Sequence, residues 1–223
     1  MNNIKLQYQT VKPILRSVLE RLMQMKDFDP FCLVGGTSLS LRYGHRMSDD
    51  IDLFTDAEYG SLDFCKLQDI LRKEFAYCYG DYGTIVGLGV SYLVGNTKDD
   101  CVKLDLFYTD KFIRPITLQD NIRIASVDDI VAMKMDVLSH GGRKKDFWDL
   151  HLLHNYYSIK QMVSLYEERY PYGVEREDCI RGLINFKLAE FDPDPICMKD
   201  KVWQLIKLDF TEWVEDFEKA SLT

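Results

Sequence analysis

Hydrophobic residues recur along the chain with two different periods, which divide it into a mixed first part and a helical second part. Up to residue 125, short apolar runs alternate with segments of helical spacing, whereas the helical spacing continues almost without interruption from residue 126 onward. The pattern predicts strands at 31–34, 51–54, 84–88, 90–94 and 102–108. It predicts helices at 5–26, 37–42, 61–77, 127–139, 145–154, 158–169, 175–187 and 199–219. We therefore expect an α+β fold with two domains, a mixed β-sheet flanked by helices in residues 1–125 and a C-terminal helical region in residues 126–223.

The composition is that of an ordinary globular protein. Hydrophobic residues make up 46% and charged residues 29% of the 223 positions, which excludes a disordered, collagen-like or coiled-coil chain. The longest uncharged run, 82–97, contains four glycines and is shorter than the roughly 20 apolar residues of a membrane span. The 6 cysteines are scattered and form no C-x-x-C pair, so we expect free thiols and a location in the reducing cytoplasm, with no membrane partner.

The net charge of -8 excludes a broadly basic surface of the kind that coats nucleic acid. Residues 1–125 carry 15 basic and 17 acidic side chains, and residues 126–223 carry 13 and 19, so the acidity is concentrated in the second part. The segment 140–145, His-Gly-Gly-Arg-Lys-Lys, is a compact basic exception. Any RNA partner would therefore bind through a local patch.

Three aspartates lie on predicted strands in positions that suit metal binding. Asp50 and Asp52 alternate along one strand and so share one face, and Asp105 lies between two leucines on another strand. An ionised carboxylate in an apolar strand is costly unless it is paired or bound to a metal. Three such acids would form an oxygen-rich site suited to Mg²⁺. The alternative is that Asp50 caps a turn and that Asp52 and Asp105 face solvent.

A glycine-rich turn precedes these acids. Gly35, Gly36, Thr37 and Ser38 lie between an apolar strand and a short helix that Thr37 is expected to cap. Backbone N–H groups at such a helix start can bind a phosphate, and glycine allows close approach. The turn is not a Walker A loop, because no G-x-x-x-x-G-K-[ST] occurs in the chain.

A Gly-Gly turn, a short helix, a D-x-D pair and a distant third aspartate follow one another along the chain, and this pattern resembles that of the polymerase β-type nucleotidyltransferases. The segment VGGTSLSLRYGHRMSDDIDLF is similar to the opening motif of the nucleotidyl transferase AbiEii toxin family. A second resemblance is KMDVLSHGGRKKDFWDL, at 134–150, where the glycine at 142 replaces a proline that some members have. The residues that match the second motif in order are Lys134, Arg143, Lys145, Asp146, Asp149 and Leu150. The resemblance covers roughly residues 30 to 155 and implies a polymerase β-like core whose active-site cleft is completed by the helical region.

The resemblance also implies roles for the residues in the first motif. The turn that contains Gly35, Gly36, Thr37 and Ser38 would hold the triphosphate of an NTP. Asp50 and Asp52 would bind two Mg²⁺ ions, with Mn²⁺ as an alternative. Asp105 would complete the catalytic metal site and help to deprotonate the attacking hydroxyl.

The second motif would supply the remaining nucleotide-binding residues. Lys134 and the catalytic Lys145 would neutralise the triphosphate, together with Arg143. Asp146 would orient Lys145, and Asp149 would tie its helix to the core.

Two basic pairs have alternative interpretations. The pair His45 and Arg46 either forms a solvated turn or contacts phosphate or an acceptor strand. Arg143 and Lys144 either keep the protein in solution or bind an RNA backbone.

The function that the resemblance implies is transfer of a nucleoside monophosphate from an NTP to an acceptor hydroxyl, with release of pyrophosphate. The acceptor would be RNA, in particular a tRNA end, and the enzyme would be the toxin of a toxin–antitoxin or phage-defence system with an antitoxin partner. Three alternatives stay open: adenylylation of a protein hydroxyl, modification of a small molecule such as an antibiotic, and an inactive module that binds a partner. The last would be expected to lack one of the acids or the Gly-Gly turn, and all of these are present.

Overall fold

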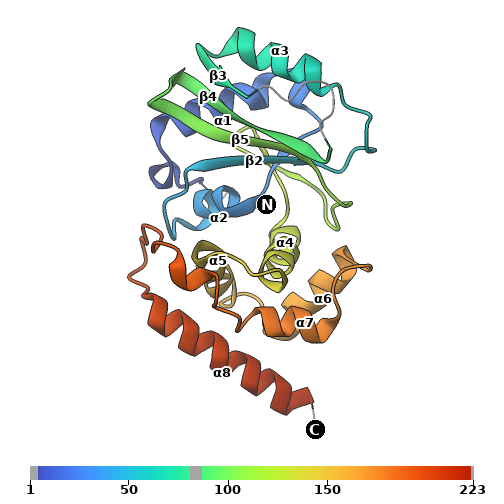
Figure 1. Ribbon diagram of the computed structural model, residues 1–223, viewed down its shortest axis with the longest axis vertical. Coiled ribbons are helices and arrows are strands. Elements are labelled where there is room, and N and C mark those ends of the chain that lie inside the picture. Colours follow the sequence, from blue (N-terminus) through green and yellow to red (C-terminus); the bar gives the residue numbers. More distant parts are fainter. Residues whose placement is uncertain (1–4, 81–86, 222–223) are drawn as a thin grey trace. The chain divides into compact units, whose positions relative to one another are not determined.

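The chain folds into two compact units, which are shown in the computed structural model of Figure 1. The structure describes residues 5–80 and 87–221, so most of the predicted strand at 84–88 lies outside the described residues. The first unit consists of Met1–Gly44 and Ser48–Ala125, and the second of His45–Met47 and Ser126–Thr223. Residues 45–47 belong to the second unit although the residues on both sides of them belong to the first, a feature that the sequence pattern does not predict.

The first unit is built on a mixed sheet, as predicted. Its described strands are β1 (Cys32–Leu33), β2 (Asp50–Thr55), β3 (Tyr77–Tyr79), β4 (Gly89–Thr97), β5 (Asp100–Tyr108), β6 (Thr117–Gln119) and β7 (Ile122–Ile124). They lie in the order β3-β4-β5-β2-β1-β7-β6. The pairs β2–β5 and β1–β7 are parallel and the others are antiparallel.

Three helices of the first unit pack on this sheet: α1 (Pro13–Gln24), α2 (Gly35–Tyr43) and α3 (Phe64–Glu74). In Figure 1, α1 and α3 lie against one face of the sheet, and α2 lies beside β2 on the other face. Proline at the first position of α1 fixes a helical φ without the loss of a needed hydrogen bond. The helix α3 is capped by the Asp63 side chain, which accepts from the backbone N–H of Lys66 at 3.0 Å.

The alternation along β2 and β5 separates the core from the candidate site. Leu53, Leu104 and Leu106 are fully buried on the face that α1 covers, where each contributes roughly 1.5–3 kcal/mol to folding. The intervening residues point to the opposite face of the sheet, which is the face of α2. Asp52 is directly opposite Asp105 in the parallel register of these two strands, so the predicted acids share one face.

The second unit contains five described helices: α4 (Val127–Ser139), α5 (Lys144–Leu153), α6 (Ile159–Arg169), α7 (Arg176–Gly182) and α8 (Trp203–Ser221). Within this unit α4 packs on α5, α6 and α7, and α8 packs on α5 and α6. The predicted helix at 175–187 ends early because, beyond Gly182, Leu183 and Ile184 donate to carbonyls three residues back, at 3.0 and 3.3 Å. No helix in the described ranges combines the length and the apolar character that a bilayer crossing requires.

Residues 45–47 form a short antiparallel pairing within the second unit. The backbone N–H of Met47 donates to the Ile196 carbonyl at 2.9 Å, and that of Met198 donates to the His45 carbonyl at 2.9 Å. Arg46 is opposite Cys197 in this pairing. The short segment between α2 and β2 is thus held by residues about 150 positions further along the chain.

Candidate active site

The N-terminal turn of α2 begins two residues earlier than the sequence predicts. Val34 is the extended residue before the helix, so the predicted N-cap role of Thr37 is wrong and Gly35, Gly36, Thr37 and Ser38 form the first turn. Gly35 has a φ of +65°, a conformation that favours glycine. A Cβ at this position would lie 2.3 Å from Oδ2 of Asp52. Glycine therefore lets the Asp52 carboxylate approach the start of the helix.

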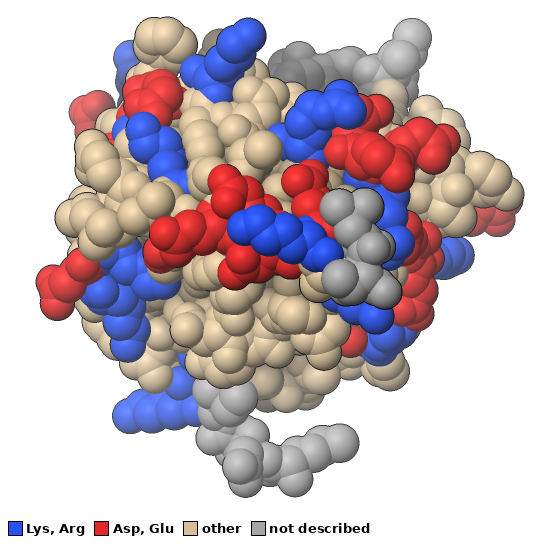
Figure 2. Space-filling view, turned by 90° about the horizontal axis from the view of Figure 1, so that it is seen from below, with Lys and Arg blue, Asp and Glu red and all other residues tan. Residues whose placement is uncertain are grey.

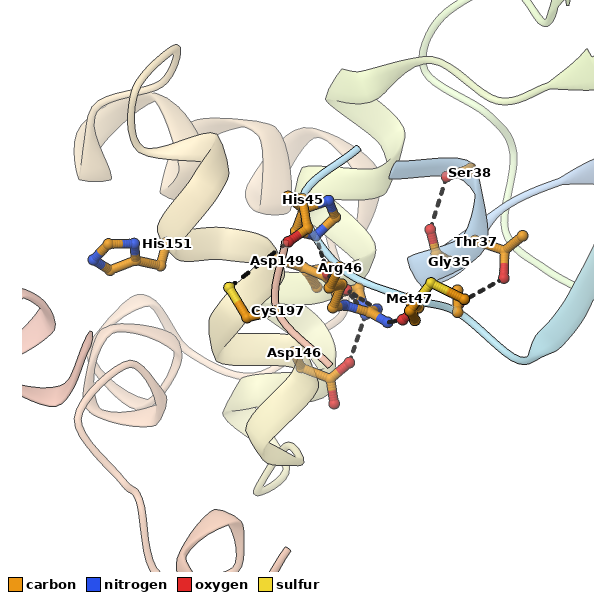
Figure 3. A network of polar contacts seen from close by, with 12 residues as sticks. Gly35, Thr37, Ser38, His45, Arg46, Met47, Asp146, Asp149, His151 and Cys197 are labelled. Atoms are coloured by element: carbon orange, nitrogen blue, oxygen red, sulfur yellow. Dashed lines mark hydrogen bonds and ion pairs between the residues drawn. The ribbon is translucent and has the colours of Figure 1, made fainter. Parts of the chain in front are cut away.

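The two hydroxyls of this turn are engaged with the protein. Thr37 Oγ1 lies 2.8 Å from Ser48 Oγ and donates to the Asp50 carbonyl at 2.5 Å. Ser38 Oγ donates to the Gly35 carbonyl at 2.7 Å, as Figure 3 shows. Both side chains are buried. The groups of this turn that suit an incoming phosphate are therefore its backbone N–H groups, since the first turn of a helix has no internal acceptors for them.

Asp50, Asp52 and Asp105 occupy the sheet face described above. Asp105 is 15% exposed and its Oδ2 accepts from Nζ of Lys103 at 2.5 Å. Its other oxygen, Oδ1, is buried and has no hydrogen-bond partner. The prediction that Asp105 lies on a strand beside the D-x-D pair is confirmed by the strand register.

These residues fit a divalent metal in their chemistry, although they do not form a ready-made cage. Among the described residues, no three His, Cys, Asp or Glu side chains are already arranged around one ion position. The donor set is nevertheless three carboxylates, which are ligands that Mg²⁺ prefers. Oδ1 of Asp105 is a buried acceptor that lacks a partner, and a cation would supply one. The chemistry of this donor set is therefore compatible with a divalent cation such as Mg²⁺.

A second group of predicted residues comes together inside the second unit, around the carboxylate of Asp149. This carboxylate is fully buried and accepts from Arg46 Nε at 2.7 Å and Nη2 at 2.8 Å. It also accepts from His45 Nε2 at 2.7 Å, and Nζ of Lys134 lies 2.8 Å away. Lys134 makes a further ion pair with Asp146 at 2.5 Å. Figure 3 shows His45, Arg46, Asp146 and Asp149 converging in this network.

The charges in this network balance. Burial by itself would raise the pKa of Asp149, but Arg46 and Lys134 hold that pKa well below its usual value. Burial likewise opposes the charge of Lys134, yet Asp146 and Asp149 raise its pKa. Burial lowers the pKa of His45, so its ring is neutral near pH 7, with its Nδ1 buried and without a hydrogen-bond partner. Two cations thus face two anions, and the Lys134 ammonium is bound to carboxylates of its own unit.

The remaining basic residues lie at the start of α5. Arg143 is exposed, and its backbone N–H donates to Asp146 Oδ2 at 2.9 Å. Asp146 therefore bonds to Lys134 and to the helix start, and Lys145, the residue before it, is partly exposed. Lys144 is buried and pairs with Asp194 at 2.9 Å, so the expectation that it lies on a solvated or RNA-binding surface is wrong.

Sequence reasoning missed the pairing of His45 and Arg46 with Asp149. Both are 2% exposed, so a solvated turn, one of the two interpretations of this pair, is excluded. One signal was present: Asp149 follows an aromatic pair in an apolar helix, where a carboxylate needs a cation. The sequence alone does not reveal that this cation comes from a residue about 100 positions earlier.

Comparisons with known proteins agree with this geometry. The family described as "Nucleotidyl transferase AbiEii toxin, Type IV TA system" matches residues 17–221. An uncharacterized protein of Aquifex aeolicus (strain VF5) is 28% identical over 214 residues, which cover 93% of each chain.

Two solved structures are similar in fold. JHP933 from Helicobacter pylori has a TM-score of 0.58 and 18% identity, with 93% of this chain and 91% of that chain covered. MenT4, a nucleotidyltransferase toxin of Mycobacterium tuberculosis H37Rv, has a TM-score of 0.56 and 13% identity, with 91% and 83% covered.

Proposed function

The chain belongs to the nucleotidyl transferase AbiEii toxin family, and from that premise we propose that it is a Mg²⁺-dependent enzyme that transfers a nucleoside monophosphate from an NTP to an RNA hydroxyl. One observation carries the proposal. The carboxylates of Asp50, Asp52 and Asp105 share one face of paired strands, and Asp52 approaches the start of α2 at Gly35. Carboxylates beside phosphate-binding N–H groups are what nucleotidyl transfer requires.

The predicted site residues of the first unit have distinct roles in this proposal. The backbone N–H groups at the start of α2 bind the triphosphate, while the hydroxyls of Thr37 and Ser38 keep the turn in shape. Asp50 and Asp52 hold Mg²⁺, which when bound stabilises the charge that develops on the phosphates. Asp105 would complete the metal site with its carboxylate, whose Oδ1 has no other partner, and would help to deprotonate the attacking hydroxyl. The bond from the α-phosphorus to this hydroxyl oxygen forms as the bond to pyrophosphate breaks.

The residues of the second motif divide into two roles. Lys134 and Asp146 position the start of α5, since they are bonded to each other and Asp146 also accepts from the Arg143 backbone. Arg143 is the residue just before that helix and Lys145 lies in its first turn, and we assign both to the nucleotide phosphates on the strength of the family motif.

RNA is the acceptor that we propose, with a tRNA end as the first candidate. The exposed Arg143 in the basic segment 140–145 is the feature that supports an RNA acceptor, and the family description, a toxin of a type IV toxin–antitoxin system, supports an antitoxin as a genetic partner. On the face drawn in Figure 2, the described acidic and basic side chains are mixed and do not form one continuous basic surface. Because the net charge of the chain is -8, binding of RNA should be weak, local and sensitive to salt.

A labelling experiment tests the acceptor. The full-length protein is incubated with Mg²⁺, each α-labelled NTP in turn and a cell lysate, and RNA and protein are then separated on gels. Label on RNA supports the proposal and identifies the base. Label on a protein band replaces RNA by a protein hydroxyl as acceptor, and absence of label with no NTP bound supports an inactive binding module.

A further inference from the structure

Lys103 lies on the same strand face as the three acids of the candidate site. It precedes Asp105 by two residues on β5, so both side chains point to one face, and it is directly opposite Asp50 in the register with β2. Its Nζ lies 2.5 Å from Asp105 Oδ2. The proposed metal ligand therefore already has a cation bound to it.

This ion pair differs from an ordinary surface pair. The Asp105 side chain is only 15% exposed, while that of Lys103 is 46% exposed. Burial by itself would lower the pKa of Lys103, but the carboxylate of Asp105, and further those of Asp50 and Asp52, raise it. All three acids are thus close enough to act on one ammonium group.

We propose that Lys103 is the built-in counter-ion of the metal site, whose ammonium holds Oδ2 of Asp105 until a divalent cation displaces it. The inference rests on the proposed function, because it takes Asp50, Asp52 and Asp105 as metal ligands. Three clustered carboxylates repel one another when no cation is present, and Lys103 relieves this repulsion in the free protein. The same contact has to break before Oδ2 can bind a metal, because two cations cannot share one ligand site without strong repulsion.

Lys103 is a positioning residue in this account, and it has opposite effects on the two states of the site. It stabilises the protein without metal and weakens metal binding by competition. A lysine that served only to contact a phosphate would leave metal binding unchanged when no nucleotide is present. This difference makes the inference testable without measurement of activity.

The test is Mn²⁺ binding to the full-length protein without nucleotide, at pH 7.5 and constant ionic strength, followed by the electron paramagnetic resonance signal of free Mn²⁺. Lys103→Met keeps the length of the side chain and removes its charge, so its Kd for Mn²⁺ should fall about fivefold, the equivalent of about 1 kcal/mol for a partly exposed pair. Lys103→Arg keeps the charge and should bind Mn²⁺ as the wild type does.

A matched control separates local competition from a change in net charge. Lys66→Met removes a lysine that pairs with Asp27 on an exposed part of the first unit, so it should leave the Kd unchanged. In thermal unfolding with EDTA, Lys103→Met should melt below the wild type, and added Mn²⁺ should raise its Tm more than that of the wild type.

The outcomes distinguish this inference from the proposed function. The inference is supported if Lys103→Met binds Mn²⁺ more tightly than the wild type while Lys103→Arg and Lys66→Met do not. Equal or weaker binding by this variant, while the wild type binds Mn²⁺, overturns the role of Lys103 and leaves the metal-dependent function intact. Absence of Mn²⁺ binding by both proteins overturns the inference and the metal site together.

Discussion

Removal of the Asp149 carboxylate should destabilise the second unit more than the loss of an ordinary surface charge. Asp149→Ala deletes an acceptor that receives two hydrogen bonds from Arg46, one from His45 and an ion pair from Lys134. Lys134 keeps Asp146 as a partner, whereas Arg46 loses both of the hydrogen bonds that it donates to the Asp149 carboxylate, and its bond to the Met47 carbonyl at 2.9 Å supplies no negative charge. The buried guanidinium thereby loses the carboxylate with which it pairs.

The expected loss follows from this geometry. A broken buried ion pair typically costs about 3–5 kcal/mol, because the remaining charge stays desolvated. The total stability of a domain is only about 5–15 kcal/mol, so the variant should be near its limit of folding. Asp149→Asn keeps the shape and one acceptor oxygen, and its loss should be about 1.5–3 kcal/mol.

Urea unfolding followed by tryptophan fluorescence is a direct assay, since all 3 tryptophans of the chain belong to the second unit. Asp178→Ala is the matched control, because it removes an exposed carboxylate that pairs with Arg181 at 2.7 Å, and it should change stability by less than about 0.5 kcal/mol. A loss below about 1 kcal/mol for both Asp149 variants would refute the assignment of this network as a stabilising, charge-balanced core.

Three further predictions concern pH, backbone and thiol chemistry. The pKa of Asp149 is lower in the folded than in the unfolded protein, where it is about 3.9, so its ionised carboxylate stabilises the fold above that pH. This stabilisation should be lost as the pH falls through the folded pKa. The urea midpoint of Asp149→Asn should therefore depend less on pH below about 5 than that of the wild type. Gly35→Ala should abolish transfer, because a methyl group would meet Asp52. Gly60 also has a positive φ, of +80°, but nothing lies within 4 Å of an added Cβ, so Gly60→Ala should keep transfer and lose only about 1–2 kcal/mol of stability, as transfer assays and urea unfolding of both variants would show. Burial raises the pKa of Cys179 to about 12, so this thiol should resist iodoacetamide at pH 8 in the folded protein, and peptide mass spectrometry that found it fully alkylated would contradict its burial.

Local periodicity accounts for most of the fold. The alternation of polar and apolar residues on β2 and β5 predicts that Asp50, Asp52 and Asp105 share one face, and the parallel register confirms it. The helix that starts at Gly35 rather than after Thr37 shows the limit of capping rules, because Thr37 uses its hydroxyl on Ser48 and Asp50 instead.

Long-range contacts could not be read from the sequence. Residues 45–47 belong to the second unit because they pair with residues 196–198, and no local feature of the sequence indicates such a pairing. For the same reason Lys134 was expected to neutralise a triphosphate, whereas the structure surrounds it with Asp146 and Asp149. A charge in a motif can be assigned to a ligand only when its partners in the fold are known.

We propose that the carboxylates on β2 and β5 form the centre for nucleotidyl transfer. The test measures the rate at which an α-labelled NTP is transferred to RNA by two variants, Asp52→Asn and Asp49→Asn. Asp49 is the matched control, because it lies three residues before Asp52, is exposed and pairs with Lys12. The account predicts that Asp52→Asn lowers the rate at least about a hundredfold while its urea midpoint stays within experimental error, since loss of a group that stabilises transition-state charge costs that much. Asp49→Asn should keep the wild-type rate. Full activity of Asp52→Asn would contradict the account.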